Sequence, residues 1–262
     1  MNQEPVLVDI SGPVCTISIN LAHKRNAIDR PSATLLRNAF ERFESSTDLR
    51  VAVLSGIGGN FCAGADLKAM TDPGLRNELD DQGRGPGPMG PSRMLFTKPV
   101  IAAVSGYAVA GGLELAAMCD LRIVEKSVVF GVFCRRWGVP LIDGGTVRLP
   151  RIIGQGRALD MILTGRPVGA EEALQMGLAN RIVEDGDGLA AAQALACQIA
   201  EFPQQCLNAD RFSSYRQWDY DLAEALRQEG AGGYPIILQE SITGAQRFTQ
   251  GAGRHGSFRD EP

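Results

Sequence analysis

The chain has 262 residues, a formal net charge of -4 and only two histidines. Its length suits one large domain or a domain with a small appendage, and its charge provides no basic surface for nucleic acid or an anionic membrane. The six cysteines show no CxxC spacing. We therefore expect reduced thiols in a cytoplasmic protein, no metal site and no secretory signal.

The N-terminal part of the chain predicts alternating strands and helices. Residues 6–10 and 14–19 are rich in apolar and β-branched residues around a Ser-Gly-Pro turn, which predicts a hairpin. Apolar spacing predicts an amphipathic helix from Pro31 to about Ser46, and residues 51–54 read as a short buried strand. Strand, helix and strand in this order are typical of a βαβ unit.

Residues 70–91 have no regular pattern. Residues 83–91 are mostly glycine and proline, which excludes a regular helix or strand there. A loop this long in a compact domain is either functional or mobile. We interpret it as a flexible wall or lid over a pocket, with surface disorder as the alternative.

Residues 100–120 organise the chain. The first five are small and apolar and predict a buried strand, after which glycines allow a sharp turn into a helix. That helix opens on Gly111 and Gly112, so its N-terminal N–H groups suit a negatively charged ligand oxygen. Glu114 lies one turn further among apolar residues, where a carboxylate is costly unless it has a partner or a function.

Other interpretations of these residues stay open. By its length the stretch could span a membrane, which the glycines and Glu114 disfavour. It could also be a plain core strand and helix in which Glu114 caps another element. Asp143 precedes two glycines, so its side chain could point into a cavity or serve as the N-cap of the next segment.

The rest of the chain becomes increasingly helical. Short strands are predicted at residues 121–124, 128–131 and 181–183, and helices at 157–163, 170–176, 189–200, 219–228 and 236–248. We expect two domains, residues 1–188 with α/β structure and residues 189–262 as a helical subdomain.

Several short motifs occur in a specific order between residues 6 and 183. They include Lys24-Arg25-Asn26-Ala27, Phe61-Cys62-Ala63-Gly64-Ala65-Asp66-Leu67 and Gly111-Gly112-Leu113-Glu114, with others at residues 98–107, 119–120, 130–131, 144–146, 163–165 and 173–178. The ordered set resembles the crotonase superfamily, also called the enoyl-CoA hydratase/isomerase family. The resemblance implies an α/β fold of stacked ββα units with a C-terminal helical region that completes a homotrimer or a dimer of trimers.

The resemblance also implies an acyl-CoA substrate, with coenzyme A as part of the thioester and no tightly bound cofactor. The backbone N–H groups of Ala65 and Gly111 correspond to the family's oxyanion hole, and the Gly/Pro loop is expected to help shape the acyl pocket. Arg247, Phe248, Arg254 and His255 either contact CoA or belong to a solvated tail. The residues implied for binding CoA or substrate are Lys24, Arg25, Ala27, Ala63, Gly64, Asp66, Leu67, Tyr107, Gly112, Cys134 and Trp137.

Glu114 matches the first of two glutamates in family hydratases, whereas Cys134 stands where the second is expected. Asp143 falls where some relatives place a working aspartate, so Glu114 and Asp143 are the expected catalytic acid-base pair. The expected function is enoyl-CoA hydration or isomerisation. The alternatives are an acyl-CoA hydrolase or dehalogenase with Asp143 as nucleophile, and a non-catalytic acyl-CoA-binding scaffold.

Overall fold

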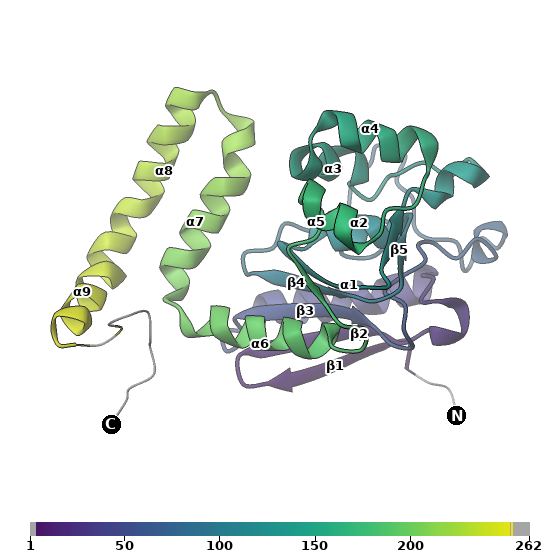
Figure 1. Cartoon of the computed structure of the whole chain (residues 1–262). Coiled ribbons are helices and arrows are strands. Elements are labelled where there is room, and N and C mark those ends of the chain that lie inside the picture. The colour runs from purple at the N-terminus through teal and green to yellow at the C-terminus, as the bar shows by residue number, and fades with distance from the viewer. Residues whose placement is uncertain (1–3, 252, 254–262) are drawn as a thin grey trace. The chain divides into compact units, whose positions relative to one another are not determined.

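A computed structural model describes residues 4–251 and 253 (Figure 1). The chain divides into two compact units between Ile199 and Ala200. The division into residues 1–188 and 189–262 that the sequence favours stays a prediction. None of the helices in the described residues is long and apolar enough to cross a membrane.

A six-stranded sheet with the order β1-β2-β3-β4-β6-β8 forms the base of the N-terminal unit. The predicted hairpin is confirmed, because β1 and β2 pair antiparallel around Gly12, which has a φ of 55°. The other neighbouring strands pair parallel, and the fully buried apolar residues of β4 suit the centre of such a sheet. The strands are β1 (Val6–Ser11), β2 (Val14–Ile19), β3 (Val51–Gly56), β4 (Val100–Val104), β6 (Leu121–Glu125) and β8 (Arg181–Val183).

A second sheet leads into the candidate site. Its strands β5 (Tyr107–Val109) and β7 (Val129–Gly131) pair parallel, and an isolated bridge joins Cys62 to Ala108. Strand β5 ends directly before α2 (Gly111–Met118), in which every residue is buried. The loop after β3 and the start of α2 are therefore held close together.

Helix α1 (Arg30–Ser45) begins as the sequence predicts. Asp29 accepts a hydrogen bond from the Ser32 N–H over 3.1 Å, and Pro31 occupies the first turn. Its buried Phe40 and Phe43 belong to the core. The other helices of this unit are α3 (Gly145–Ile153), α4 (Gln155–Thr164) and α5 (Ala170–Met176), with short 3-10 turns at Ala22–Lys24, Ala69–Thr71 and Phe133–Trp137. Helix α6 (Gly188–Glu201) runs across the division between the two units.

The C-terminal unit is a helical hairpin with an extension. Helices α7 (Gln204–Arg216) and α8 (Leu222–Ile236) contact each other, and a π-helical turn at Ile237–Ser241 leads into α9 (Ile242–Thr249). Asp221 caps α8 by accepting the Glu224 N–H over 2.9 Å. Arg254 and His255, which the sequence places near CoA as one alternative, lie outside the described residues.

Candidate active site

Two backbone turns meet at the start of α2. A Cβ atom at Gly64 would lie 2.9 Å from the Ala110 Cβ and 3.0 Å from the Gly111 nitrogen. A Cβ at Gly112 would lie only 2.0 Å from the Cys62 carbonyl oxygen. Both positions therefore require glycine, since any side chain would push the two turns apart.

The close approach brings two N–H donors to one cavity. Ala65 and Gly111 both line it. Within the described residues neither N–H donates a hydrogen bond. Ala110, just before Gly111, has a φ of 53° and a ψ of -124°, a conformation that costs a residue with a Cβ about 1–3 kcal/mol. Backbone strain at a functional turn is a common feature of active sites.

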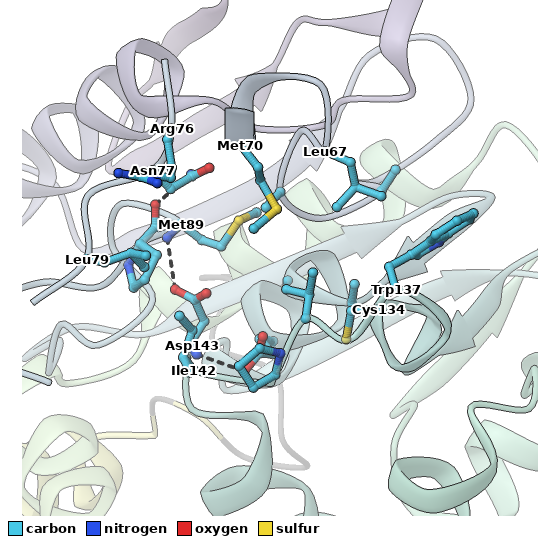
Figure 2. Close-up of a pocket in the computed structure, with 18 of the residues that line it drawn as sticks. Leu67, Met70, Arg76, Asn77, Leu79, Met89, Cys134, Trp137, Ile142 and Asp143 are labelled. Carbon is cyan, nitrogen blue, oxygen red and sulfur yellow. Dashed lines mark hydrogen bonds between the residues drawn. The ribbon is translucent and has the colours of Figure 1, made fainter. Parts of the chain in front are cut away.

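The cavity has a volume of about 230 Å³ and is mostly apolar (Figure 2). It lies between the irregular segment after β3 and the turn before α3. The residues that line it are Ala63, Ala65, Leu67, Met70, Arg76, Asn77, Leu79, Pro88, Met89, Ala110, Gly111, Glu114, Phe133, Cys134, Trp137, Val139, Pro140, Ile142 and Asp143. Pro88 and Met89 belong to the Gly/Pro segment, so this segment forms part of the cavity wall.

Glu114 is a buried acid with two main-chain partners. Its side-chain oxygen Oε1 accepts the N–H of Asp143 over 2.9 Å and that of Gly145 over 2.8 Å. Gly145 is the first residue of α3, so Glu114 caps another helix, as one interpretation of the sequence allows. It also lines the cavity, so the capping contact and a catalytic role are compatible.

Asp143 reaches the same cavity but does not cap a helix with its side chain. Gly144 is the N-cap of α3, so the N-cap interpretation is wrong. The Asp143 Oδ1 instead accepts the Met89 N–H over 2.9 Å and the Ser92 hydroxyl. The carboxylate therefore fastens the Gly/Pro segment to the turn before α3.

The burial of both acids raises their pKa values. Burial, and next the charge of Asp143, raise the pKa of Glu114 to about 7, against the opposing effect of two N–H groups. Burial also raises the pKa of Asp143, although hydrogen bonds from Ser92 and Met89 oppose it. Because their charges interact, the two acids titrate as a pair. Near neutral pH the cavity can therefore hold one protonated and one ionised carboxyl group.

Comparisons with known proteins show the family of this chain. The family model for enoyl-CoA hydratase/isomerase matches residues 9–249. The chain belongs to the enoyl-CoA hydratase/isomerase family. It is 37% identical over 201 residues to enoyl-CoA hydratase EchA19 of Mycobacterium tuberculosis, which covers 74% of each chain. It is 34% identical to the carnitinyl-CoA dehydratase of Salmonella arizonae, over 92% of this chain and 93% of the relative.

Solved structures confirm the fold that the resemblance implies. The crystal structure of enoyl-CoA hydratase EchA1 from Mycobacterium marinum superposes with a TM-score of 0.87 at 33% identity, covering 94% of this chain and 96% of that chain. The protein is therefore an enzyme of the enoyl-CoA hydratase/isomerase type with the crotonase α/β fold and a C-terminal helical region.

Cys134 stands where the resemblance implies the second glutamate of the family hydratases. It lines the cavity and is 7% exposed. Burial and then the charge of Glu114 raise the pKa of its thiol, so the thiol is neutral at pH 7. A neutral thiol does not replace a second carboxylate, which leaves Asp143 as the other acid in the cavity.

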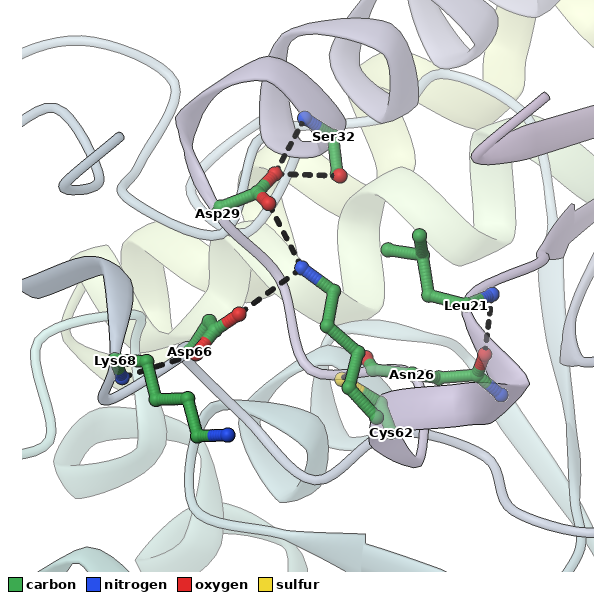
Figure 3. A network of polar contacts seen from close by, with 8 residues as sticks. Leu21, Asn26, Asp29, Ser32, Cys62, Asp66 and Lys68 are labelled. Carbon is green, nitrogen blue, oxygen red and sulfur yellow. Dashed lines mark hydrogen bonds and ion pairs between the residues drawn. The ribbon is translucent and has the colours of Figure 1, made fainter. Parts of the chain in front are cut away.

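An ion pair between Lys24 and Asp66 joins the loop before α1 to the loop after β3, and Figure 3 shows the network around Asp29 and Asp66. The Lys24 ammonium lies 2.7 Å from the Asp29 carboxylate and 3.0 Å from the Asp66 carboxylate. The Ala63 N–H donates to the Arg25 carbonyl over 3.0 Å. Lys24 is thus paired with two carboxylates, and these ion pairs give it a structural role.

The residues implied for CoA and substrate divide into two groups. The Arg25 guanidinium lies 5.4 Å from the centre of the Tyr107 ring, outside the cavity lining. Lys24, Ala27, Gly64, Asp66 and Gly112 also lie outside the lining as the described residues define it. The members that line the cavity are Ala63, Leu67, Cys134 and Trp137.

Three polar residues of the site carry no signal in the sequence. Arg93 Nε and Nη2 donate to the Ile142 carbonyl over 3.0 and 2.6 Å. Arg148 Nη1 donates to the carbonyl oxygens of Ser92 over 2.7 Å and Asp143 over 3.0 Å. Together with the Ser92 hydroxyl they fix the turn that carries Asp143, which only the folded chain reveals.

Proposed function

We propose that this enzyme adds water to a 2-enoyl-CoA thioester or moves its double bond. The observation that supports the proposal is one cavity lined by two N–H donors, Ala65 and Gly111, and two buried acids, Glu114 and Asp143. A thioester oxygen between the two donors would be stabilised as negative charge develops on it, by about 3 kcal/mol per donor.

Glu114 and Asp143 would supply the proton transfers. In hydration the ionised acid takes a proton from water, whose oxygen bonds to C3, and the protonated acid gives a proton to C2. In isomerisation one acid removes a proton from the chain and a proton returns at another carbon. The pKa of Glu114 near 7 suits either direction of transfer at neutral pH. The relatives named as a hydratase and a dehydratase support the water reaction and its reverse.

The experiment is to assay enoyl-CoA hydration and isomerisation with Glu114→Gln and Asp143→Asn. We expect each change to lower kcat by about 100-fold or more. Glu41→Gln, on the exposed face of α1, is the matched control. Unchanged activity in both cavity variants would refute the assignment of the acid pair.

A second candidate is attack of Asp143 on the substrate, as in an acyl-CoA hydrolase or dehalogenase. It is favoured by Cys134, which deprives the cavity of the second glutamate of the hydratases. A covalent acyl adduct trapped on Asp143 would support it. Acyl-CoA binding measured by calorimetry without turnover of any thioester would instead support a non-catalytic scaffold.

We also propose a homotrimer or a dimer of trimers, located in the cytoplasm. The C-terminal unit supports assembly because large apolar side chains on its helices are exposed. They include Phe212, Trp218, Leu222, Leu226, Ile237, Leu238, Ile242 and Phe248. Light scattering that gives a monomer mass would contradict the assembly.

A further inference from the structure

One side chain in the cavity wall has a polar atom without a partner. Asn77 is 5% exposed, and its Nδ2 donates to the Pro88 carbonyl over 2.9 Å. Its Oδ1 is buried and has no hydrogen-bond partner within the described part of the chain. A buried acceptor left in this state costs about 1–3 kcal/mol, so it calls for an explanation.

The amide orientation follows from its neighbour. The Pro88 carbonyl only accepts hydrogen bonds, so the NH₂ group of Asn77 must face it. A flipped amide would set two carbonyl oxygens against each other. The oxygen is therefore the atom that faces away from Pro88.

Most residues that share the cavity with Asn77 are apolar, and Arg76 lies beside it on the same side. In Figure 2, Asn77 lies with Leu79 on one side of the cavity, and Leu67 and Trp137 lie on the other. If the acyl chain of the substrate were wholly apolar, a leucine at position 77 would suit it, and no buried polar atom would be left without a partner. Met70 and Met89 also line the cavity, and their unbranched side chains can repack around a bound acyl chain.

We propose that Asn77 Oδ1 accepts a hydrogen bond from a hydroxyl group on the acyl chain, so that the preferred substrates are hydroxylated enoyl-CoA thioesters. This inference rests on the proposed function, which places the thioester at Ala65 and Gly111. The resemblance implies that the coenzyme lies on the side of Leu67, and an acyl chain that enters from there would extend towards Asn77 on the opposite side. A hydroxyl is a neutral donor, and it loses less hydration on burial than a charged donor does.

The test compares pairs of trans-2-enoyl-CoA substrates over a series of chain lengths. Within each pair, a terminal methyl group is replaced by a hydroxyl of similar size. At the matching length we expect kcat/KM to be at least about threefold higher for the hydroxylated member. In Asn77→Leu this ratio should fall by about tenfold or more, because the hydroxyl would be buried without an acceptor. Leu79→Ala, on the same side, should change both members equally and leave the ratio as in the wild type.

Several outcomes would overturn the inference. They are a preference for the methyl member at every length in the wild type, and a ratio that Asn77→Leu leaves unchanged. A preference for a carboxylate-ended chain over the hydroxylated one would also overturn it. If neither substrate is turned over, the proposed function fails. In that case calorimetry measures the affinities of saturated acyl-CoA pairs, one member hydroxylated and the other unsubstituted. The ratio of the two affinities, compared between the wild type and Asn77→Leu, then tests the inference.

Discussion

The main-chain N–H of Asp143 donates to Glu114 Oε1 over 2.9 Å. The two acidic residues are therefore linked through the main chain of Asp143 and not through its carboxyl group. The carboxyl group of Asp143 faces other partners, Met89 and Ser92. Each acid thus has its own set of hydrogen bonds, which lets their protonation states differ while their positions stay fixed.

Removing the charge of Glu114 should stabilise the protein at alkaline pH. The pKa of Glu114 is raised by folding from its ordinary value of 4.5 to about 7, so its ionisation across that range lowers the stability of the fold. At about pH 8 we expect the free energy of unfolding of Glu114→Gln to exceed that of the wild type by up to about 3 kcal/mol. At about pH 4, where the acid is protonated in both states, this advantage should vanish. Urea titrations at both values measure it, and a gain that is the same at both would contradict the pKa shift.

Two substitutions of Asp143 should separate its structural role from its chemistry. Asparagine retains an oxygen that can accept from Met89 and Ser92, whereas alanine leaves the Met89 N–H without its acceptor. We expect Asp143→Asn to keep nearly the wild-type thermal midpoint and Asp143→Ala to lose about 1–3 kcal/mol of stability. Both should lose activity. Equal stability of the two variants would show that the carboxylate does not hold the Gly/Pro segment.

Ser92→Ala should alter the pH dependence of catalysis. The Ser92 hydroxyl stabilises the ionised form of Asp143, so its loss should raise the pKa of that acid further. The rate limb that follows ionisation of Asp143 should then move to higher pH. Ser45→Ala is the control, because its hydroxyl donates to the Arg42 carbonyl at an exposed position of α1. A profile that does not move would separate Ser92 from the catalytic acid.

Glycine 112 should not tolerate a methyl group. In Gly112→Ala the Cβ would meet the Cys62 carbonyl at 2.0 Å, so the two turns that carry Ala65 and Gly111 must separate. We expect the free energy of unfolding to fall by several kcal/mol. Any variant protein that still folds should lose acyl-CoA binding. Gly156→Ala in α4 is the matched control, because its Cβ meets nothing within 4 Å. It should stabilise the helix by about 0.5–1 kcal/mol. Similar melting curves for both variants would contradict the close approach.

The strands and most helices could be predicted because their patterns are local. The hairpin of β1 and β2 follows from β-branched runs around a turn, and α1 follows from its apolar spacing. Helix α3 was not predicted as a whole, because Gly145 and Pro150 disfavour a helix by local propensity. Tertiary contacts outweigh this preference, among them the bond from the Gly145 N–H to Glu114. Helix α7 was also missed, since its polar residues mask any apolar stripe.

The candidate site could be predicted only in part. Short glycine motifs indicate the turns at Ala65 and Gly111, because only glycine suits such close backbone approach. The partners of Asp143 lie 51 and 54 residues away in the chain, within a segment that has no periodicity. Contacts of that kind depend on how the chain folds back, and a single sequence carries no local trace of them.

Cys134 has a consequence for anyone who would redesign this enzyme. Introducing a glutamate there would set a third acid beside Glu114, whose charge already raises the pKa of the thiol. Three carboxyl groups in one mostly apolar pocket would share protons, and their charges would repel one another. Asp143 would therefore have to be replaced by an uncharged residue in the same variant. Positions 134 and 143 should be substituted together and not one at a time.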